Sequence, residues 1–498
     1  MASYYLLLSL LLFPFLLFLK IISTSPKHRY RLPPGPWTIP IIGSIHHLIG
    51  AGHPHYALRD LSRKYGDLMY LQLGEIPSVV VSSKEAAREV LKTHDLAFST
   101  RFAHSTVKIL FYDGKDMGFA PYGEHWRELR KICVLELLSS KQVQSFRSVR
   151  DEEVRSMIQW ISNSASSSGG IVNLSEGLLV MINNVVLRAI MGNKFKDQKK
   201  ALNDVLKVFD LITGFNLANL FPSSGIVNMI SGTKQKAKEC HWTLDQLLDS
   251  IIQEHRTRES DGEVEDLLRV LLKLYDENSE NNLLTPDIIK AVILDLITAG
   301  TDTTTVTLDW TIAELMKNPE VMQKAQTEVR QQLQGRDYIT ESDLAKLNFL
   351  HLVIKETMRL HPPGPLLPRE CREACKIFGY NIPKGACVLV NLWALGRDSK
   401  HWKDADDFKP DRFADMNSDV SLNALEFIPF GAGRRSCPGM SFGLAILELA
   451  LANLLYHFNW ELPCGMKPDE LDMTETFGFT TRKKIPLLLQ AQRYIALT

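Results

Sequence analysis

The sequence predicts a mainly α-helical protein: one large helical body with small β-sheets, preceded by an N-terminal transmembrane anchor. Three observations support this prediction. Apolar residues recur every three to four positions over most of the chain, which is the helical period. Alternating apolar residues occur mainly at 67–83 and 377–391, and the first 22 residues are almost continuously apolar. We expect an anchor at 1–22, a basic, proline-rich elbow at 23–40 and a single catalytic domain at 41–498.

The anchor prediction rests on the order of apolar and basic residues. Between Tyr4 and Leu19 all but two residues are Leu, Phe or Tyr, which is about enough to cross a bilayer with some tilt or thinning. Four basic residues follow this run and none precedes it: Lys20, Lys27, Arg29 and Arg31. The positive-inside rule therefore keeps the rest of the chain in the cytosol. A cleaved secretory peptide, the alternative, carries its positive charge before the apolar region.

The composition excludes several classes of protein. Lys and Arg number 57, Asp and Glu also 57, and 45% of the 498 residues are hydrophobic, which is typical of a globular protein. With zero formal net charge, no overall basic field exists to attract nucleic acid. The seven cysteines are scattered and odd in number, which indicates a reducing compartment. Cys371 and Cys375 lie four apart without further paired ligands, so a zinc site is not expected.

The remaining elements follow from periodicity and turn residues. The prolines at 33, 34, 36 and 40 predict a stiff elbow after the anchor. The alternation at 67–83 predicts a β-hairpin, and the segment at 377–391 predicts a small β region with its turn at 383–385. Polar stretches at 162–170 and 257–266 are expected to be surface loops. Helices are expected at 84–93, 123–138, 140–162, 234–258, 285–317, 349–360 and 441–458.

The strongest chemical signal is the decapeptide at 430–439, Phe-Gly-Ala-Gly-Arg-Arg-Ser-Cys-Pro-Gly, which precedes the helix at 441–458. Its glycines allow positive φ, and the helix N-terminus favours a thiolate at Cys437. A nucleophilic cysteine needs a general base, and no histidine stands close in sequence, although a distant one remains possible. An axial haem ligand needs what this segment offers: one sulfur, shielding by Phe430 and a cationic Arg435 to meet a propionate.

A second signal lies inside the helix expected at 285–317. Its start at Thr285-Pro286-Asp287 has a capping hydroxyl, a proline and an acid suited to the first turn. Its centre, Ala-Gly-Thr-Asp-Thr-Thr-Thr at 299–305, is made of poor helix formers, and such internal weakness indicates function or strain. We expect a locally widened turn at Gly300. The alternative is that the threonines only bond back to preceding carbonyls.

The segment at 430–439 resembles the haem-binding signature of the cytochrome P-450 superfamily, and that at 299–305 resembles its oxygen-activation motif. The resemblance covers nearly the whole chain and implies the cytochrome P-450 fold. It implies haem b with Cys437 as the axial thiolate and only metal ligand. Asp302 and Thr303 are then the catalytic acid and alcohol of a proton relay.

Two further sets of residues match the superfamily. Glu356 and Arg359 lie three apart on one helical face, and Arg412 would join them in a buried structural triad. Trp126 and Arg130 share a helical face, for which packing or cation–π stacking is the alternative. The resemblance implies that the cofactor-binding residues are Arg101, Trp126, Arg130, Arg369, Phe430, Arg435 and Cys437.

Within the superfamily, the proline elbow and the segments Ala-Pro-Tyr-Gly at 120–123 and Pro-Arg-Glu at 368–370 resemble the plant A-type group, including its terpene hydroxylases. This implies a monooxygenase of the endoplasmic reticulum membrane that inserts one atom of O2 into a C–H bond of a hydrophobic specialised metabolite. NADPH would act only through NADPH-cytochrome reductase, which we expect to dock near Arg127, Lys131 and Arg434.

The substrate is expected to be a sesquiterpene or diterpene. Alkaloids, phenylpropanoids, indoles and aldoximes are alternatives, as are a non-oxygenating haem-thiolate isomerase or dehydratase and a haem-binding sensor. The first non-oxygenating class would have no use for the Asp302-Thr303 pair. By family position, the pocket walls are expected at 104–117 and 209–221. Six further wall residues are expected: Leu296, Ala299, Leu366, Leu367, Phe477 and Phe479.

Overall fold

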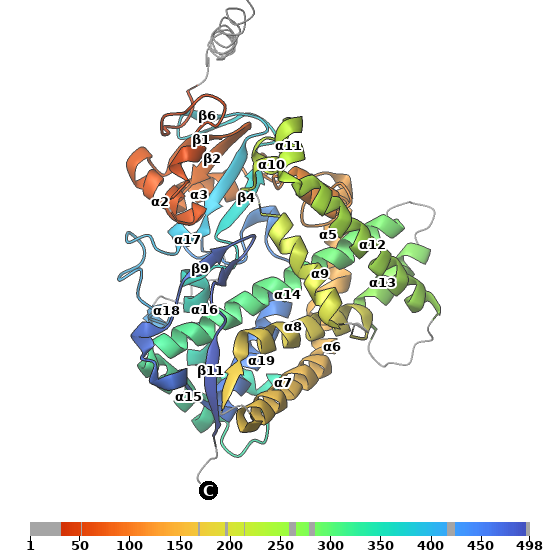
Figure 1. Cartoon of the computed structure of the whole chain (residues 1–498), viewed down its shortest axis with the longest axis vertical. Helices are drawn as coiled ribbons and strands as arrows, with labels where there is room; N and C mark the ends of the chain where they lie inside the picture. The colour runs from red at the N-terminus through yellow and green to blue at the C-terminus, as the bar shows by residue number, and fades with distance from the viewer. Residues whose placement is uncertain are drawn as a thin grey trace, which may run out of the picture.

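The structure is a computed structural model of the chain. It describes residues 31–50, 52–167, 170–194, 198–213, 215–257, 265–277, 284–415 and 424–494. Helices make up most of the body, and the strands near residues 68–81 and 366–391 gather at one end of it (Figure 1). The predicted anchor at 1–22 and most of the predicted loop at 257–266 lie outside the described residues.

The helices follow the predicted pattern and add several that periodicity alone did not single out. The α-helices are α2 (Pro54–Tyr65), α3 (Lys84–Arg88), α4 (Ser105–Leu110), α5 (Glu124–Ile132), α6 (Ser140–Ser145), α7 (Arg147–Ser167), α8 (Leu174–Met191), α9 (Gln198–Leu211), α10 (Leu217–Leu220), α11 (Gly225–Ser231), α12 (Thr233–Thr257), α13 (Leu267–Glu277), α14 (Pro286–Lys317), α15 (Pro319–Gln332), α16 (Asn348–Leu360), α17 (Leu392–Leu395), α18 (Arg412–Asp415) and α19 (Met440–His457). Short 3₁₀ turns occupy Ile45–His47, Glu341–Lys346, Gly433–Arg435, Pro463–Gly465 and Pro468–Glu470.

Four small sheets complete the fold. The largest has the order β1-β2-β7-β4, in which β1 and β2 form the predicted hairpin, β2 and β7 are parallel, and β7 and β4 are antiparallel. The other sheets are β3-β11-β8, β5-β6 and β9-β10. The strands are β1 (Leu68–Leu73), β2 (Ile76–Val81), β3 (Ile171–Asn173), β4 (Leu366–Glu370), β5 (Cys375–Ile377), β6 (Tyr380–Ile382), β7 (Cys387–Asn391), β8 (Phe458–Glu461), β9 (Glu475–Phe477), β10 (Thr481–Lys483) and β11 (Leu488–Arg493).

Three details correct the predicted elements. The turn at 383–385 joins strands of two different sheets, β6 and β7, and so is not a hairpin turn. The helix expected at 140–162 breaks at the buried Phe146 into α6 and α7. The loop expected from 162 begins later, because α7 continues to Ser167; the hydroxyls of Ser162 and Ser166 donate to carbonyl groups four residues back and so fit a helix.

Helix periodicity also hides two local changes of winding. The predicted helices at 84–93 and 123–138 both start as α-helices and end in π turns, at Glu89–Thr93 and Cys133–Leu137. By contrast, α14 is an unbroken α-helix, so the widened turn expected at Gly300 is wrong. Gly300 serves close packing instead: a Cβ atom there would lie 3.2 Å from a methyl group of Val186 in α8.

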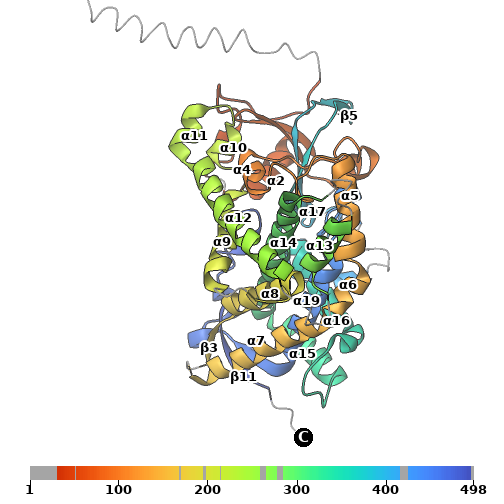
Figure 2. The same ribbon diagram turned by 90° about the vertical axis from the view of Figure 1, so that its right-hand side faces the viewer.

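Helix α14 runs through the middle of the body (Figures 1 and 2). It contacts α8, α16, α19 and the β10 strand, and most of its side chains are buried. Among the described residues, α8 and α19 are long and apolar enough to cross a membrane, but 72% of the 18-residue stretch in α8 and 56% of that in α19 is buried inside the body. Their hydrophobicity is therefore that of core helices around α14.

The described part of the elbow covers the edge of the main sheet. The N–H of Tyr70 in β1 donates to the carbonyl of Pro34 at 2.8 Å, and the N–H of Asn381 in β6 donates to the carbonyl of Arg31 at 2.7 Å. Gly35 is required here, since a Cβ atom would lie 2.0 Å from the Tyr70 carbonyl oxygen. The elbow therefore protects an edge strand that would otherwise expose unpaired backbone groups.

Candidate active site

A cavity of about 300 Å³ lies beside the centre of α14. Its other walls come from β4, the loop before α19, the start of α5 and the C-terminal half of α9. Most of the lining side chains are apolar, and the polar ones gather at two places: the cysteine loop and the centre of α14. The cavity thus brings together segments from residue 101 to residue 479, as a single catalytic body requires.

The cysteine loop folds tightly around its sulfur. Gly431 and Gly433 both have φ of +70°, and the Cys437 N–H donates to the Phe430 carbonyl at 2.8 Å. A Cβ atom on Gly433 would lie 2.6 Å from the Leu91 carbonyl oxygen, so only glycine fits there. Helix α19 starts three residues after the sulfur, with Gly439 as its N-cap. The predicted nest before a helix N-terminus is therefore present.

The Cys437 side chain lines the cavity and is accessible from it, although it lies deep inside the body. Burial raises the pKa of its thiol, while the N–H of Gly439 and the positive charges of Arg101 and Arg130 lower that pKa. The opposing effects follow from the position: protein atoms replace water around the sulfur, and nearby donors favour its anionic form. Phe430 also lines the cavity, as the predicted shielding of the sulfur requires.

Three arginines stand at one side of the cavity: Arg101 and Arg435 line it, whereas Arg369, which follows the lining residue Pro368, does not. Arg369 and Arg435 are buried, and Arg101 is half-buried. Arg435 donates to the carbonyl oxygens of Ser99 at 2.6 Å and Met117 at 3.2 Å, and also to that of Ala120. Arg101 donates to two carbonyls, at 3.2 and 3.4 Å. Arg369 is held only by its neighbour's carbonyl, at 3.1 Å. Among the described residues, none of these hydrogen bonds goes to a carboxylate.

Two atoms of this cationic wall have no hydrogen-bond partner in the described structure: Arg101 Nε and Arg369 Nη2. Burial and mutual repulsion lower the pKa of Arg369 to about 9 and that of Arg435 to about 8. Such buried guanidinium groups need anionic partners, because an unpaired buried charge is costly. The two carboxylates of haem match this demand, so the residues present fit the cofactor.

The predicted pair on α5 supports the same wall. Arg130 reaches Ser436 in the cysteine loop, with its Nη2 atom 3.4 Å from the hydroxyl oxygen. The Trp126 indole N–H donates to the Met117 carbonyl at 3.1 Å, and the Arg435 guanidinium lies 4.1 Å from the Trp126 ring centre. The cation that stacks on Trp126 is thus Arg435 of the cysteine loop, whereas the predicted alternative was stacking within the α5 pair; both Trp126 and Arg130 line the cavity.

A pair of buried carboxyl groups beside this wall was missed by the sequence reasoning. Asp295 accepts from the Gly118 N–H at 2.8 Å, and Asp116 accepts from the Phe119 N–H at 2.7 Å. Burial and mutual repulsion raise the pKa of Asp116, and burial raises that of Asp295 to about 6. The available signal was the spacing of Asp295, seven residues before Asp302 on one face of α14.

The acid and alcohol of α14 are held differently. The Thr303 hydroxyl lines the cavity and donates to the Ala299 carbonyl at 2.8 Å, so back-bonding occurs at this residue. The Asp302 carboxylate is buried and binds Arg482 at 2.5 and 2.8 Å and the Thr480 hydroxyl at 2.6 Å. Burial raises the pKa of Asp302, and the charge of Arg482 opposes that rise.

Thr480 and Arg482 were also missed. They lie on the β9–β10 hairpin, about 180 positions from Asp302, and no local spacing joins the two segments. Arg482 is partly exposed, and its guanidinium lies 5.1 Å from the ring of Phe209 in α9. The only sequence signal was the basic run that begins at Arg482, three positions after Phe479.

Five of the six individually predicted wall residues line the cavity, and so does part of each expected segment. Leu296, Ala299, Leu366, Leu367 and Phe479 line it, together with Phe111, Met117, Phe209 and Ile212 from the two expected segments. Phe477 does not line it. It precedes the tight turn of the β9–β10 hairpin, and its ring lies 5.6 Å from that of Phe215 and 5.9 Å from that of His55, outside the cavity.

The predicted structural triad is assembled away from the cavity. Arg359 binds both oxygens of Glu356 at 2.8 Å, and Arg412 Nε lies 2.9 Å from one of them. Glu356 and Arg359 are fully buried. The remaining N–H groups of Arg359 donate to backbone carbonyl oxygens, so every charge in the triad has a partner.

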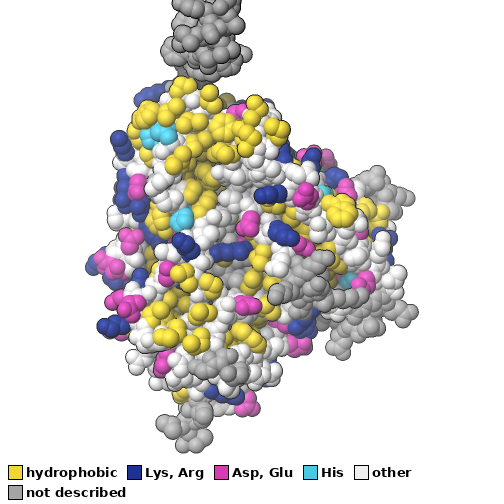
Figure 3. Space-filling view, viewed as in Figure 1, with side chains coloured by type: hydrophobic (Ala, Val, Ile, Leu, Met, Phe, Trp, Pro, Cys, Tyr) yellow, Lys and Arg dark blue, Asp and Glu magenta, His cyan; other side chains and the backbone are white. Residues whose placement is uncertain are grey.

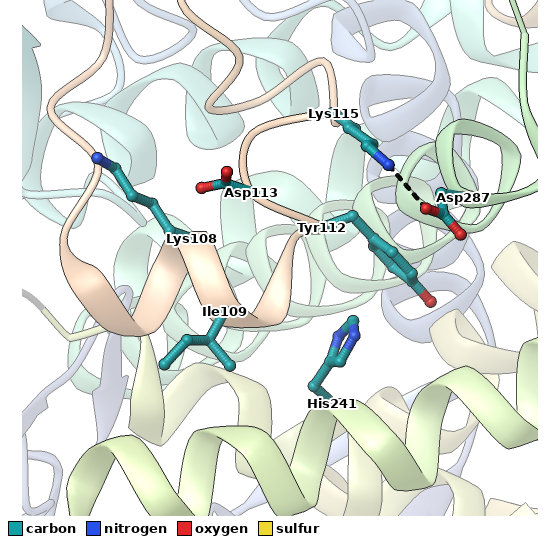
Figure 4. A pocket seen from close by; sticks show the side chains of 7 residues that line it. All are labelled: Lys108, Ile109, Tyr112, Asp113, Lys115, His241 and Asp287. Atoms are coloured by element: carbon teal, nitrogen blue, oxygen red, sulfur yellow. Dashed lines mark hydrogen bonds and ion pairs between the residues drawn. The ribbon is translucent and has the colours of Figure 1, made fainter.

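An open surface cleft lies between α4, α12 and the start of α14 (Figure 4). Its lining is polar, and Lys115 and Asp287 form an ion pair at 2.7 Å across its rim. Tyr112 also donates to Asp245 at 2.7 Å. Lys115 and Asp287 thus neutralise each other, and no cysteine stands among the described residues that line the cleft.

The fold and the cavity define a large helical body built around one cysteine, a cationic wall and an apolar chamber. The family model described as cytochrome P450 matches residues 33–488, and the chain belongs to this family. Members hold haem through a cysteine thiolate, so the predicted fold, the haem-thiolate cofactor and the cytochrome P450 monooxygenase class are confirmed.

The chain is similar to several curated plant proteins over nearly all of its length. It is 48% identical over 481 residues to desmethyl-deoxy-podophyllotoxin synthase of Sinopodophyllum hexandrum, covering 95% of this chain and 94% of that one. It is 47% identical to 5-epiaristolochene 1,3-dihydroxylase of Nicotiana tabacum and 45% identical to premnaspirodiene oxygenase of Hyoscyamus muticus, with 99% of each chain covered. A solved zebra fish cytochrome P450 with progesterone matches with a TM-score of 0.75 at 28% identity, over 89% of this chain and 99% of that one.

Proposed function

We propose that the chain is a haem-thiolate monooxygenase in which Cys437 is the axial ligand. The observation that carries this proposal is the single thiol facing the cavity, beside arginines of which Arg101 and Arg369 each keep one nitrogen without a hydrogen-bond partner in the described structure. Arg101, Arg369 and Arg435, with Trp126 and Arg130, would hold the two haem carboxylates, and Phe430 would shield the sulfur. When bound, haem supplies the activation of O2 and the insertion of one oxygen atom into a C–H bond.

The chain's own residues would deliver protons to the cavity. Thr303 offers a hydroxyl at the cavity surface, and Asp302 in the next position holds a carboxylate whose protonation is balanced between burial and Arg482. Arg482 is partly exposed, so it links the buried carboxylate to solvent. We propose that Arg482 and Thr480 position Asp302. A proton would then pass from the Asp302 carboxyl group to the Thr303 hydroxyl oxygen at the cavity surface.

The proposed substrate is a sesquiterpene or diterpene. The apolar wall made by Leu296, Leu366, Leu367 and Phe479 favours a hydrophobic skeleton with few polar groups. Several relatives are named as enzymes of sesquiterpene chemistry, among them costunolide synthase of Lactuca sativa, which is 47% identical. The lignan-type name of another relative keeps phenylpropanoid-derived substrates as the second candidate.

We further propose that the body rests on the endoplasmic reticulum membrane, with its electrons supplied by NADPH-cytochrome reductase. Hydrophobic side chains gather at the end of the body where the described chain begins (Figure 3). Ile226, Met229 and Ile230 of α11 are exposed there, as are Trp37 and Ile41. The α10 segment is joined to this end by a hydrogen bond from the Glu75 N–H to the Leu220 carbonyl. On the cysteine side, Arg127 and Lys131 are exposed and suit an acidic partner.

The thiolate assignment is tested by the reduced protein in the presence of carbon monoxide. We expect the long-wavelength Soret band that reports thiolate ligation in the native chain and in Cys464→Ser, whose thiol lies outside the cavity. The band should be lost in Cys437→Ser. A band of unchanged position in Cys437→Ser would refute the assignment.

The reaction and substrate are tested by co-expressing the chain with a reductase in cells that make single terpene skeletons. Hydroxylated product with NADPH-dependent oxygen consumption supports the proposal. Rearranged product without oxygen consumption would indicate an isomerase or dehydratase, and haem binding without turnover on any substrate would indicate a sensor.

A further inference from the structure

We propose that Cys371 and Cys375 form a reversible disulfide, a redox-modification site separate from the catalytic cavity. Cys371 directly follows β4 and Cys375 is the first residue of β5, at the sheet end of the body (Figures 1 and 2). The inference does not depend on the proposed monooxygenase function, because neither thiol lines the cavity.

The backbone brings the two thiols together. The chain bends at Arg372 and Glu373, between the two cysteines. Cys371 is held against the β6–β7 connection: its N–H donates to the Ala386 carbonyl at 3.0 Å, and its sulfur lies 3.8 Å from the Ile382 carbonyl oxygen. Ile382 is also the cross-strand partner of Cys375 in the β5–β6 ladder. Cys375 packs against the hydrophobic cluster that contains Cys371. The Cys371 thiol also donates to the carbonyl of Glu373, which lies between the two cysteines, at 3.0 Å.

The two thiols differ in the way that a redox pair requires. Cys371 is fully buried, whereas Cys375 is half-buried and reachable from solvent. Interaction with the neighbouring Cys371 thiol lowers the pKa of Cys375, while interaction with Cys375, together with burial, raises the pKa of Cys371. Cys375 is therefore the thiol that an oxidant meets first, and Cys371 is the resolving thiol beside it.

The oxidant we name is hydrogen peroxide, and the step balances without another reactant. The Cys375 thiolate attacks the peroxide, a sulfur–oxygen bond forms, the oxygen–oxygen bond breaks and hydroxide leaves. The Cys371 sulfur then attacks the sulfenic acid, the sulfur–oxygen bond breaks, and the proton of Cys371 leaves with the oxygen as water. Two thiols are oxidised to one disulfide while one peroxide is reduced to two water molecules.

The structure also argues against other roles for the pair. Within the described residues, no group of three or more potential ligands stands ready to hold a metal ion. The Cys371–Cys375 disulfide closes a very short loop, so its formation should change the free energy of unfolding little. What the bond changes is the chemistry of the thiols: a disulfide is restored by reductant, whereas an isolated oxidised cysteine continues toward sulfinic acid.

The test uses the full-length, haem-loaded chain in detergent, treated with increasing hydrogen peroxide, alkylated and digested with trypsin. Arg372 lies between the two cysteines, so trypsin separates the peptides 370–372 and 373–376 unless a disulfide joins them. We expect the joined pair to accumulate with peroxide and to disappear on reduction. Cys464, which is exposed and distant in sequence from other cysteines, serves as the comparison thiol.

Two variants make the result decisive. In Cys371→Ser, Cys375 should lose its reversible product and accumulate sulfinic acid. In Cys375→Ser, which alters only the half-buried partner, Cys371 should stay reduced under peroxide that oxidises Cys464. The proposal is overturned if the native chain yields Cys375 sulfinic acid with Cys371 still alkylatable, if Cys375 pairs with another cysteine, or if neither thiol reacts when Cys464 does.

Discussion

Two buried arginine clusters in this molecule look alike in composition but differ in their partners. Arg359 in the structural triad is fully buried, binds both oxygens of Glu356 and donates to three backbone carbonyls. Arg369 beside the cavity is also buried, but it has one carbonyl contact and one unpaired nitrogen. The difference teaches that burial alone does not separate a structural arginine from a ligand-binding one; the separation comes from whether the chain supplies the anion.

The largest effect is expected from breaking the self-sufficient cluster. In Glu356→Gln, Arg359 and Arg412 lose the only carboxylate that the described structure gives them in the triad, which leaves buried charge uncompensated. We expect a loss of about 3–5 kcal/mol in the free energy of unfolding. Urea unfolding of the haem-loaded protein measures this loss. Asp411→Asn is the matched control, because Asp411 pairs only with Lys324 at the exposed surface; equal midpoints for the two variants would contradict the comparison.

The cofactor-facing cluster should respond in the opposite way. In Arg369→Leu, the haem-free fold loses a buried, uncompensated charge and should be as stable as the native chain or more so. Haem affinity should fall about 10- to 100-fold, because a charge-assisted hydrogen bond contributes about 1.5–3 kcal/mol. Haem retained per chain after dilution measures this, and unchanged retention would contradict the role.

The same variant carries a pH signature. Burial lowers the pKa of Arg369 to about 9, so between about pH 9 and the usual arginine range the unfolded chain binds more protons than the folded one. The stability contribution of this group therefore rises with pH across that window. In the haem-free protein the rise should be smaller for Arg369→Leu than for the native chain, and equal slopes would argue that Arg369 is not buried as a cation.

Arg482 is the intermediate case, because its partner, the Asp302 carboxylate, is itself proposed to carry a proton. In Arg482→Ala, Asp302 loses the positive charge that opposes the effect of burial, so the pKa of Asp302 should rise. We expect the acidic limb of the pH profile of product formed per NADPH consumed to move to higher pH. The ratio of product to NADPH itself should fall by less than about tenfold. Arg482→Lys should restore the profile, whereas an unshifted profile in Arg482→Ala would leave Arg482 with a packing role only.

The sequence predicted those parts of the site that depend on local spacing. The cysteine loop and the Glu356–Arg359 pair are set by short-range geometry, a tight turn and one helical face, so their positions could be read from neighbouring residues. Contacts between distant segments could not. Asp302 meets Arg482 only because a hairpin of three-residue strands packs on α14, and Phe477 leaves the cavity because the chain turns sharply before Phe479.

The same limit applies to the fold. Long periodic helices such as α12, α14 and α16 were found nearly to their ends, because their apolar spacing is continuous. The break at Phe146 and the π turns were not, since a buried side chain or one extra residue per turn alters winding without disturbing the apolar pattern. Tertiary packing decides these points.

The smallest effect is expected at Arg434, the exposed neighbour of Arg435. Its side chain is half exposed and pairs with Asp95 at 3.0 Å, so it is an arginine whose partner is supplied by the chain but lies at the surface. Arg434→Ala should change the free energy of unfolding by less than about 1 kcal/mol and leave haem retention unchanged. If a reductase docks on this side, the variant should instead weaken the salt dependence of reduction, measured by stopped-flow with the reductase. A loss of haem comparable to that of Arg369→Leu would show that a missing anion is the wrong criterion for dividing these arginines.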